Sequence, residues 1–129
     1  MRKILRSLSV LLVSVATAQA GEIARTVPSG INQRIDFLAS VNPDCSSIGT
    51  PTVRLVTGPD HGVVTTDKAR DFLPFPKTNP RSRCNSRRVA GLKLFYRSKS
   101  AFFGVDRVGL IVISAEGVER EATYVIQVK

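Results

Sequence analysis

His61 is the only histidine in this 129-residue chain, and it directly follows Asp60. A histidine beside a carboxylate can act as a general base or a metal ligand. Neighbours in sequence do not form a catalytic pair by that fact alone, and an Asp in a turn more often caps its own backbone. Both residues lie in residues 58–62, where two glycines and a proline predict a tight connection. We therefore expect His61 to be a turn residue, with an enzyme or metal protein centred on it as the alternative.

Oxygen ligands for calcium could come from four aspartates, Asp44, Asp60, Asp67 and Asp106. No run of alternating acids occurs among them, and Asp106 could equally cap a turn before a strand. The G-x-S-x-G motif of serine hydrolases is absent, and the serines lie in turn contexts. The sequence therefore predicts a protein that is not an enzyme, with no catalytic residues, no metal site and no cofactor.

The first 20 residues have the pattern of a cleaved signal peptide. Arg2, Lys3 and Arg6 form a basic start, residues 8–16 are mostly apolar, and Ala18-Gln19-Ala20 fits a small-x-small cleavage site. The apolar run is shorter than the ~20 residues that span a bilayer, and no later stretch is long and apolar enough to span one. We expect a mature chain of residues 21–129 without a transmembrane segment, periplasmic or secreted, and long enough for one domain.

Cys45 and Cys84 are the only cysteines. In an exported chain an even cysteine count predicts a disulfide, and two cysteines allow one intramolecular pairing. The alternatives are a redox pair, which usually lies close in sequence as C-x-x-C, and two thiolate ligands of a metal. The compartment favours a structural Cys45–Cys84 disulfide.

Basic residues surround the second cysteine. Without the three basic side chains of residues 1–20 the chain has 16 basic and 10 acidic side chains, a net charge of +6. Arginine forks suit carboxylates and phosphates, so this cluster predicts a site for an anionic glycan, a lipid headgroup or an acidic protein surface of the envelope. Nucleic acid is disfavoured by the compartment and by the lack of a recognition motif. The alternative is a solubilising loop. The cluster consists of Lys77, Arg81, Arg83, Arg87 and Arg88.

Short alternating or β-branched segments predict about seven strands and no long helix after residue 20. Residues 53–57 and 63–66 are expected to form an antiparallel hairpin, followed by a charged turn at residues 67–71. Two prolines make residues 72–76 an edge or an irregular packing loop. Residues 77–88 are predicted to form an exposed loop. Residues 105–114 are predicted to form a central strand, because both of its faces are apolar. Further strands are expected within residues 22–27, 31–39, 89–97 and 118–128.

The order Gly58-Pro59-Asp60-His61-Gly62-Val63-Val64, then Leu94-Phe95-Tyr96, then Phe102-Phe103-Gly104-Val105-Asp106 resembles the bacterial Ig-like and cadherin-like modules of exported proteins. Their pattern is "P-x-H-G-x-V", "L-x-Y" and "F-x-G-x-D-x-F". Val108 replaces its last aromatic residue, and the two cysteines and the long basic insertion depart from it as well. The resemblance implies an Ig-like sandwich outside the cytoplasm that serves in adhesion, scaffolding or binding, and not an enzyme.

These observations predict an all-β protein, a single Ig-like antiparallel β-sandwich in residues 21–129. The expected function is that of a non-catalytic binding module that recognises an anionic partner through its basic, disulfide-anchored loop. The alternative is a structural or assembly accessory that pairs a strand edge with the sheet of another envelope protein.

Overall fold

The computed structural model describes residues 21–129, so the predicted signal peptide lies outside the described residues. This part of the chain forms strands and one short 3₁₀ helix, and none of its helices is long and apolar enough to cross a membrane. In chain order the elements are β1 (Glu22–Val27), β2 (Gln33–Leu38), β3 (Ser40–Val41), β4 (Ser47–Gly49), β5 (Thr52–Thr57), β6 (Gly62–Asp71), η1 (Ser82–Ser86), β7 (Val89–Ser98), β8 (Gly104–Ile113) and β9 (Glu119–Val128).

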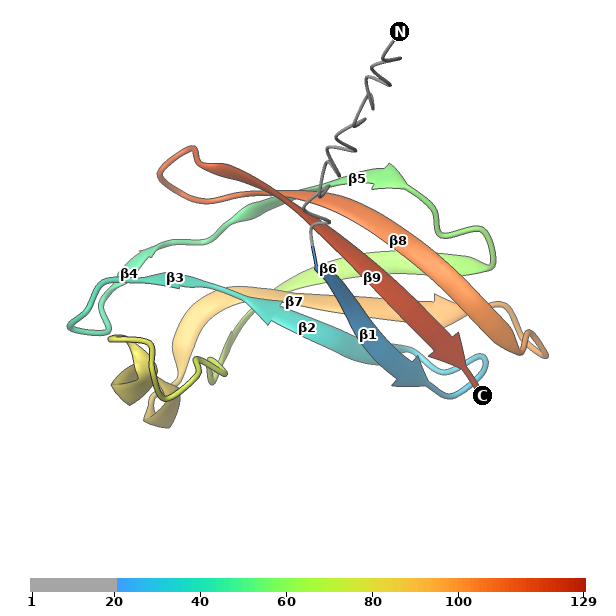
Figure 1. Cartoon of the computed structure of the whole chain (residues 1–129), viewed down its shortest axis with the longest axis horizontal. Helices are drawn as coiled ribbons and strands as arrows, with labels where there is room; N and C mark the ends of the chain where they lie inside the picture. Colours follow the sequence, from blue (N-terminus) through green and yellow to red (C-terminus); the bar gives the residue numbers. More distant parts are fainter. Residues whose placement is uncertain (1–20) are drawn as a thin grey trace, which may run out of the picture.

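The strands form two main sheets, as the predicted all-β fold requires (Figure 1). Sheet A has the order β1-β9-β8-β5 and sheet B the order β2-β7-β6, while β3 and β4 form a short ribbon. The arrangement is consistent with a β-sandwich. Residues 105–114 were predicted to form a central strand, and β8 lies between β9 and β5. One pairing is not antiparallel, because β1 runs parallel to β9 at the edge of sheet A.

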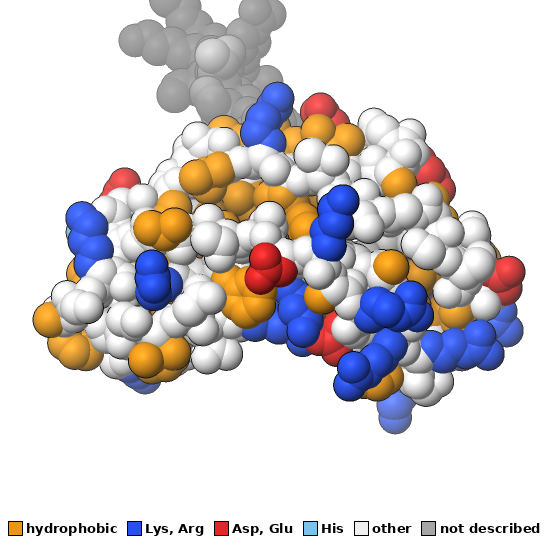
Figure 2. Space-filling view, turned by 180° about the vertical axis from the view of Figure 1, so that it is seen from behind, with side chains coloured by type: hydrophobic (Ala, Val, Ile, Leu, Met, Phe, Trp, Pro, Cys, Tyr) orange, Lys and Arg blue, Asp and Glu red, His pale blue; other side chains and the backbone are white. Residues whose placement is uncertain are grey.

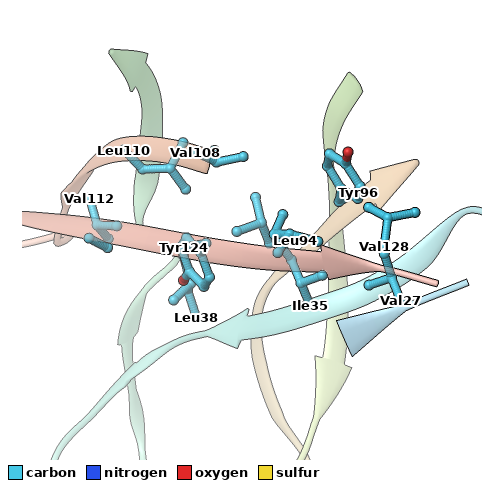
Figure 3. Packing of buried hydrophobic residues seen from close by; sticks show 12 residues of the cluster. Val27, Ile35, Leu38, Leu94, Tyr96, Val108, Leu110, Val112, Tyr124 and Val128 are labelled. Carbon is cyan, nitrogen blue, oxygen red and sulfur yellow. The ribbon is translucent and has the colours of Figure 1, made fainter. Parts of the chain in front are cut away.

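The main core lies between the two sheets (Figure 3). Every second residue of β7, β8 and β9 points into it, which is the side-chain period of a strand. Tyr96 and Tyr124 are the largest fully buried side chains. The buried members of this core are Val27, Ile35, Leu38, Leu94, Tyr96, Val108, Leu110, Val112, Ala122, Tyr124, Ile126 and Val128.

The predicted hairpin of residues 53–57 and 63–66 is wrong. β5 pairs with β8 in sheet A, whereas β6 pairs with β7 in sheet B. The connection between them is fixed to β8, because the Asp106 carboxylate accepts hydrogen bonds from the backbone N–H groups of Asp60 and His61, both at 3.0 Å. Gly58 has a φ of +61°, and a Cβ there would lie 2.0 Å from the carbonyl oxygen of Arg107. The turn therefore carries the chain from one sheet to the other.

The charged turn predicted for residues 67–71 is also wrong, because these residues continue β6 and pair with residues 89–93 of β7. β6 is an edge strand of sheet B, and an edge strand tolerates charged side chains that a central strand would bury. The segment with two prolines, residues 72–76, has no regular structure, as predicted.

A basic lobe clamped by a disulfide

Residues 72–88 fold against the outer face of sheet B and form, with the loop at residues 42–47, what we call the basic lobe. The lobe has a small core of its own, separate from the main one. Phe37 points away from the main core, yet only 4% of it is exposed because the lobe covers it. The other buried members of this second core are Val41, Leu73, Cys84 and Val89.

The predicted disulfide is present and ties together the two segments of the lobe. Cys45 and Cys84 are 39 residues apart in sequence, their Cα atoms are 5.3 Å apart, and Cys84 is fully buried. Within the lobe the side-chain amide of Asn85 makes two hydrogen bonds to the backbone of Phe75, one to its N–H at 3.0 Å and one to its carbonyl at 2.8 Å. The segment predicted to be an exposed loop is therefore an anchored structure that contains η1.

Two of the predicted anion-binding arginines also hold the lobe together. The Nε–H of Arg81 donates to the carbonyl oxygen of Val41 at 2.9 Å, and the Nε–H of Arg83 donates to that of Pro43 at 2.8 Å. Arg81 is half-buried and Arg83 is exposed. Both side chains keep their positive charge, but their Nε–H groups already donate to backbone carbonyls and are not free to bind a partner.

The other three predicted residues differ in how firmly they are placed. The guanidinium of Arg88 lies 5.4 Å from the ring centroid of Phe72, a cation–π contact. Arg87 and Lys77 are exposed. In Figure 2, Lys and Arg side chains gather on the end of the molecule where the lobe lies. Of the five residues, Lys77 and Arg87 are exposed and their side chains make no hydrogen bond or cation–π contact with the residues that the structure describes.

Arg83 and Arg87 line a surface depression of about 290 Å³ beside the disulfide, together with Ser86, Cys45 and Asp44. The hydroxyl and backbone N–H of Ser46 hold the pKa of the Asp44 carboxyl below its ordinary value, and the charge of Arg83 acts in the same direction. The depression therefore contains two cations and one anion, a composition suited to recognising an anion by charge and hydrogen bonds.

Among the residues that the structure describes, the side chains of His61 and Asp60 make no hydrogen bond to each other. The ring of His61 stacks on that of Phe102, with centroids 4.1 Å apart and planes 9° from parallel, and its backbone N–H donates to Asp106. Asp106 is only 2% exposed and also accepts a hydrogen bond from the Tyr96 hydroxyl at 2.7 Å. His61 therefore lies in the turn that was predicted for it, whereas Asp106 lies within β8 and caps this distant turn rather than one directly before its own strand.

The ionisation of Asp106 fits this structural role. Burial alone would raise the pKa of the carboxyl, but the Tyr96 hydroxyl and three backbone N–H donors outweigh burial and hold it below its ordinary value. Burial and the neighbouring carboxylate raise the pKa of Tyr96, which keeps its hydroxyl protonated as the donor.

The aspartates considered for calcium do not form a cluster. Across residues 21–129 no three His, Cys, Asp or Glu side chains come together as metal ligands would. Asp60 approaches Asp106 through its backbone N–H, and Asp44 uses its carboxylate on Ser46 in the lobe.

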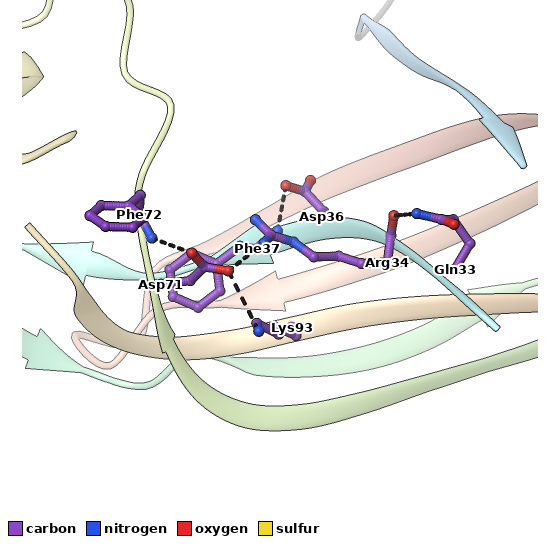
Figure 4. A network of polar contacts seen from close by, with 7 residues as sticks. All are labelled: Gln33, Arg34, Asp36, Phe37, Asp71, Phe72 and Lys93. Carbon is purple, nitrogen blue, oxygen red and sulfur yellow. Dashed lines mark hydrogen bonds and ion pairs between the residues drawn. The ribbon is translucent and has the colours of Figure 1, made fainter. Parts of the chain in front are cut away.

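Sequence reasoning missed a polar network on the outer face of sheet B (Figure 4). The Asp71 carboxylate lies between the guanidinium of Arg34 and the ammonium of Lys93, which is 3.5 Å away. Asp71 had been placed in a turn, so its cross-strand neighbours were not considered. The alternation of Lys93, Phe95 and Arg97 on one face of β7 was the signal that could have pointed to this surface.

Comparisons of the chain with known protein families, with curated proteins and with solved structures found no match.

Proposed function

We propose that this protein is a non-catalytic, exported binding module of Ig-like type, periplasmic or secreted, that recognises an anionic partner through the basic lobe. The partner is an anionic component of the envelope or an acidic protein surface. The Ig-like assignment is supported by the motifs that resemble those modules and by the four-stranded and three-stranded sheets that enclose one core. The disulfide is in keeping with an oxidising compartment.

The observation that carries the proposal is the rigid mounting of the cations. Loops that only keep a protein soluble need no fixed geometry, whereas this lobe has its own core, a disulfide and two arginines bound to backbone carbonyls. A site that is already ordered loses less conformational entropy on binding. The lobe thus presents Lys77, Arg87 and Arg88 on a fixed support.

The test is charge reversal at the two cations that are exposed and hold no part of the lobe. A cation close to an anionic surface contributes on the order of 1 kcal/mol, so K77E/R87E should weaken binding more than tenfold. Three probes should be measured separately, namely heparin, vesicles containing phosphatidylglycerol, and polyglutamate. The matched control is R54E/R120E, which makes the same charge change at exposed positions of β5 and β9. Unchanged binding of every probe by K77E/R87E would refute the proposal.

A second candidate function is strand-edge pairing through β5, and the exposure of that edge favours it. Leu55 and Val56 are 50% and 55% exposed. The other edges are protected: β6 carries charged residues, and on the far side Arg25 of β1 donates its Nε–H to the carbonyl oxygen of Ile35 in β2. Under this function, V56K would lose partner proteins in a pull-down from the envelope fraction, whereas K77E/R87E would retain them.

A further inference from the structure

The outer face of sheet B carries cations around an aromatic side chain. Lys93, Phe95 and Arg97 alternate along β7 and point away from the main core, and Phe95 is partly exposed. In the sheet register Arg34 of β2 lies beside Phe95 on one side, and Thr65 of β6 on the other. The centre of this face is therefore an aromatic residue with Arg34 and Thr65 as its cross-strand neighbours, while the Arg34 guanidinium reaches to Asp71 and the Phe37 ring.

Each end of β7 leads to a depression lined by two cations. Near Ser98 a depression of about 330 Å³ is lined by Arg97 and Lys99, with Ser98, Ser100 and Val63 beside them. Near Val89 the chain enters the basic lobe, where Arg83 and Arg87 line the other depression. Sequence reasoning had considered only the second of these.

The dimensions of this face suit a slender ligand. Nine residue steps from Val89 to Ser98 extend about 30 Å, while three strands place the outer two only about 10 Å apart. The lobe projects below sheet B at one end, and Figure 2 shows the lower outline of the molecule hollowed between its two ends. A planar membrane contacts a hollowed face poorly, whereas a linear chain can follow it.

The acidic residues on this face are largely matched by cations. Asp71 is shared by Arg34 and Lys93, and Asp67 lies opposite Lys93 in the register of β6 and β7. Arg97 makes no ion pair with any residue in the range 21–129 that the structure covers. Positive charge is therefore available at the Arg97 end and on the lobe, with a less charged, aromatic stretch between them.

We propose that a linear anionic polysaccharide lies along the outer face of sheet B, with acidic groups in the two depressions and sugar rings over Phe95. This inference rests on the proposed function, since it places one end of the ligand on the basic lobe. The spacing of the charges favours a glycan, because uncharged ring faces can cover the aromatic stretch while hydroxyl groups bond to Thr65 and Ser100. A chain that reaches both depressions gains affinity from two linked contacts.

The experiment is a length series of heparin oligosaccharides, from a disaccharide up to chains longer than β7, which extends roughly 30 Å and has a depression near each end. The wild-type affinity should rise by at least about tenfold once the chain spans both depressions, as expected for linked sites. R97E and F95A should remove this step and leave the affinity for short oligosaccharides at the lobe unchanged. The matched control R54E, on sheet A, should retain the step.

The outcomes separate this inference from the proposed function. If K77E/R87E weakens binding but the affinity shows no step with length, the lobe remains the site and the extended face is refuted. If R97E abolishes binding and K77E/R87E does not, the basic lobe is not part of the site. The ligand would then bind only at the Arg97 end of the face, and the proposed site with two contacts would be refuted. If polyglutamate of equal length binds as tightly as the glycan and F95A has no effect on either, the choice of a polysaccharide is wrong.

Discussion

Removal of the disulfide should loosen the basic lobe and leave the sandwich folded. In C45S/C84S the link across 39 residues of sequence is lost, which in the chain-entropy account lowers the free energy of unfolding by about 4 kcal/mol. A domain of this size is typically stable by about 5–15 kcal/mol, and the main core contains neither cysteine. The lobe, in contrast, has only a small core around Cys84, so its local opening should become much easier than global unfolding.

Hydrogen exchange followed by mass spectrometry would measure the local opening of the lobe and the protection of the main core in one experiment. Peptides from residues 72–88 should exchange much faster in C45S/C84S than in the wild type, while peptides from β8 and β9 should retain protection close to the reduced global stability. Urea denaturation supplies that global value. The reasoning is refuted if lobe and core peptides lose protection together, because the two cores would then unfold as one unit.

Two further predictions concern the main sandwich. D106N should destabilise the fold at neutral pH, because it leaves the Tyr96 hydroxyl and the turn N–H groups without their carboxylate acceptor. The pKa of Asp106 is lowered in the folded state, so the ionised carboxylate stabilises the fold above about pH 3.9, and this stabilisation is lost as the pH falls further. The difference in free energy of unfolding between wild type and D106N, measured by urea denaturation, should therefore be smaller at about pH 3 than at neutral pH. A difference independent of pH would contradict the role given to the carboxylate. G91A should cost about 1–3 kcal/mol, since a Cβ there would lie 2.5 Å from the carbonyl oxygen of Leu38 and 2.7 Å from the Phe37 ring, whereas G21A, with no neighbour within 4 Å, should be neutral by the same assay.

The strands could be predicted from the sequence because their side-chain period is local. The alternation in β7, β8 and β9 depends on neighbouring residues, and the buried residues follow it. The pairing of β5 and β6 is not local. Val53 and Val63 flank a turn that suits a hairpin, but β5 pairs with β8 and β6 with β7, and the turn is bonded to Asp106, over 40 residues later.

The same distinction applies to the candidate site. A cluster of cations around Cys84 is visible in the sequence, and the disulfide followed from the cysteine count. The carbonyl partners of Arg81 and Arg83 are about 40 residues away, so their structural role could not be read from the sequence. The depression beside Arg97 depends on loops that only the fold brings together.

The most direct test of the central claim is the affinity for heparin at about 0.05 M and about 0.15 M salt, across which electrostatic screening increases. Wild type and R54E/R120E should both bind, and both should weaken as salt rises, whereas K77E/R87E should bind more than tenfold less tightly at the lower salt concentration. Equal weakening by both double variants would mean that binding follows net charge alone, and unchanged binding by K77E/R87E would mean that the basic lobe is not the site.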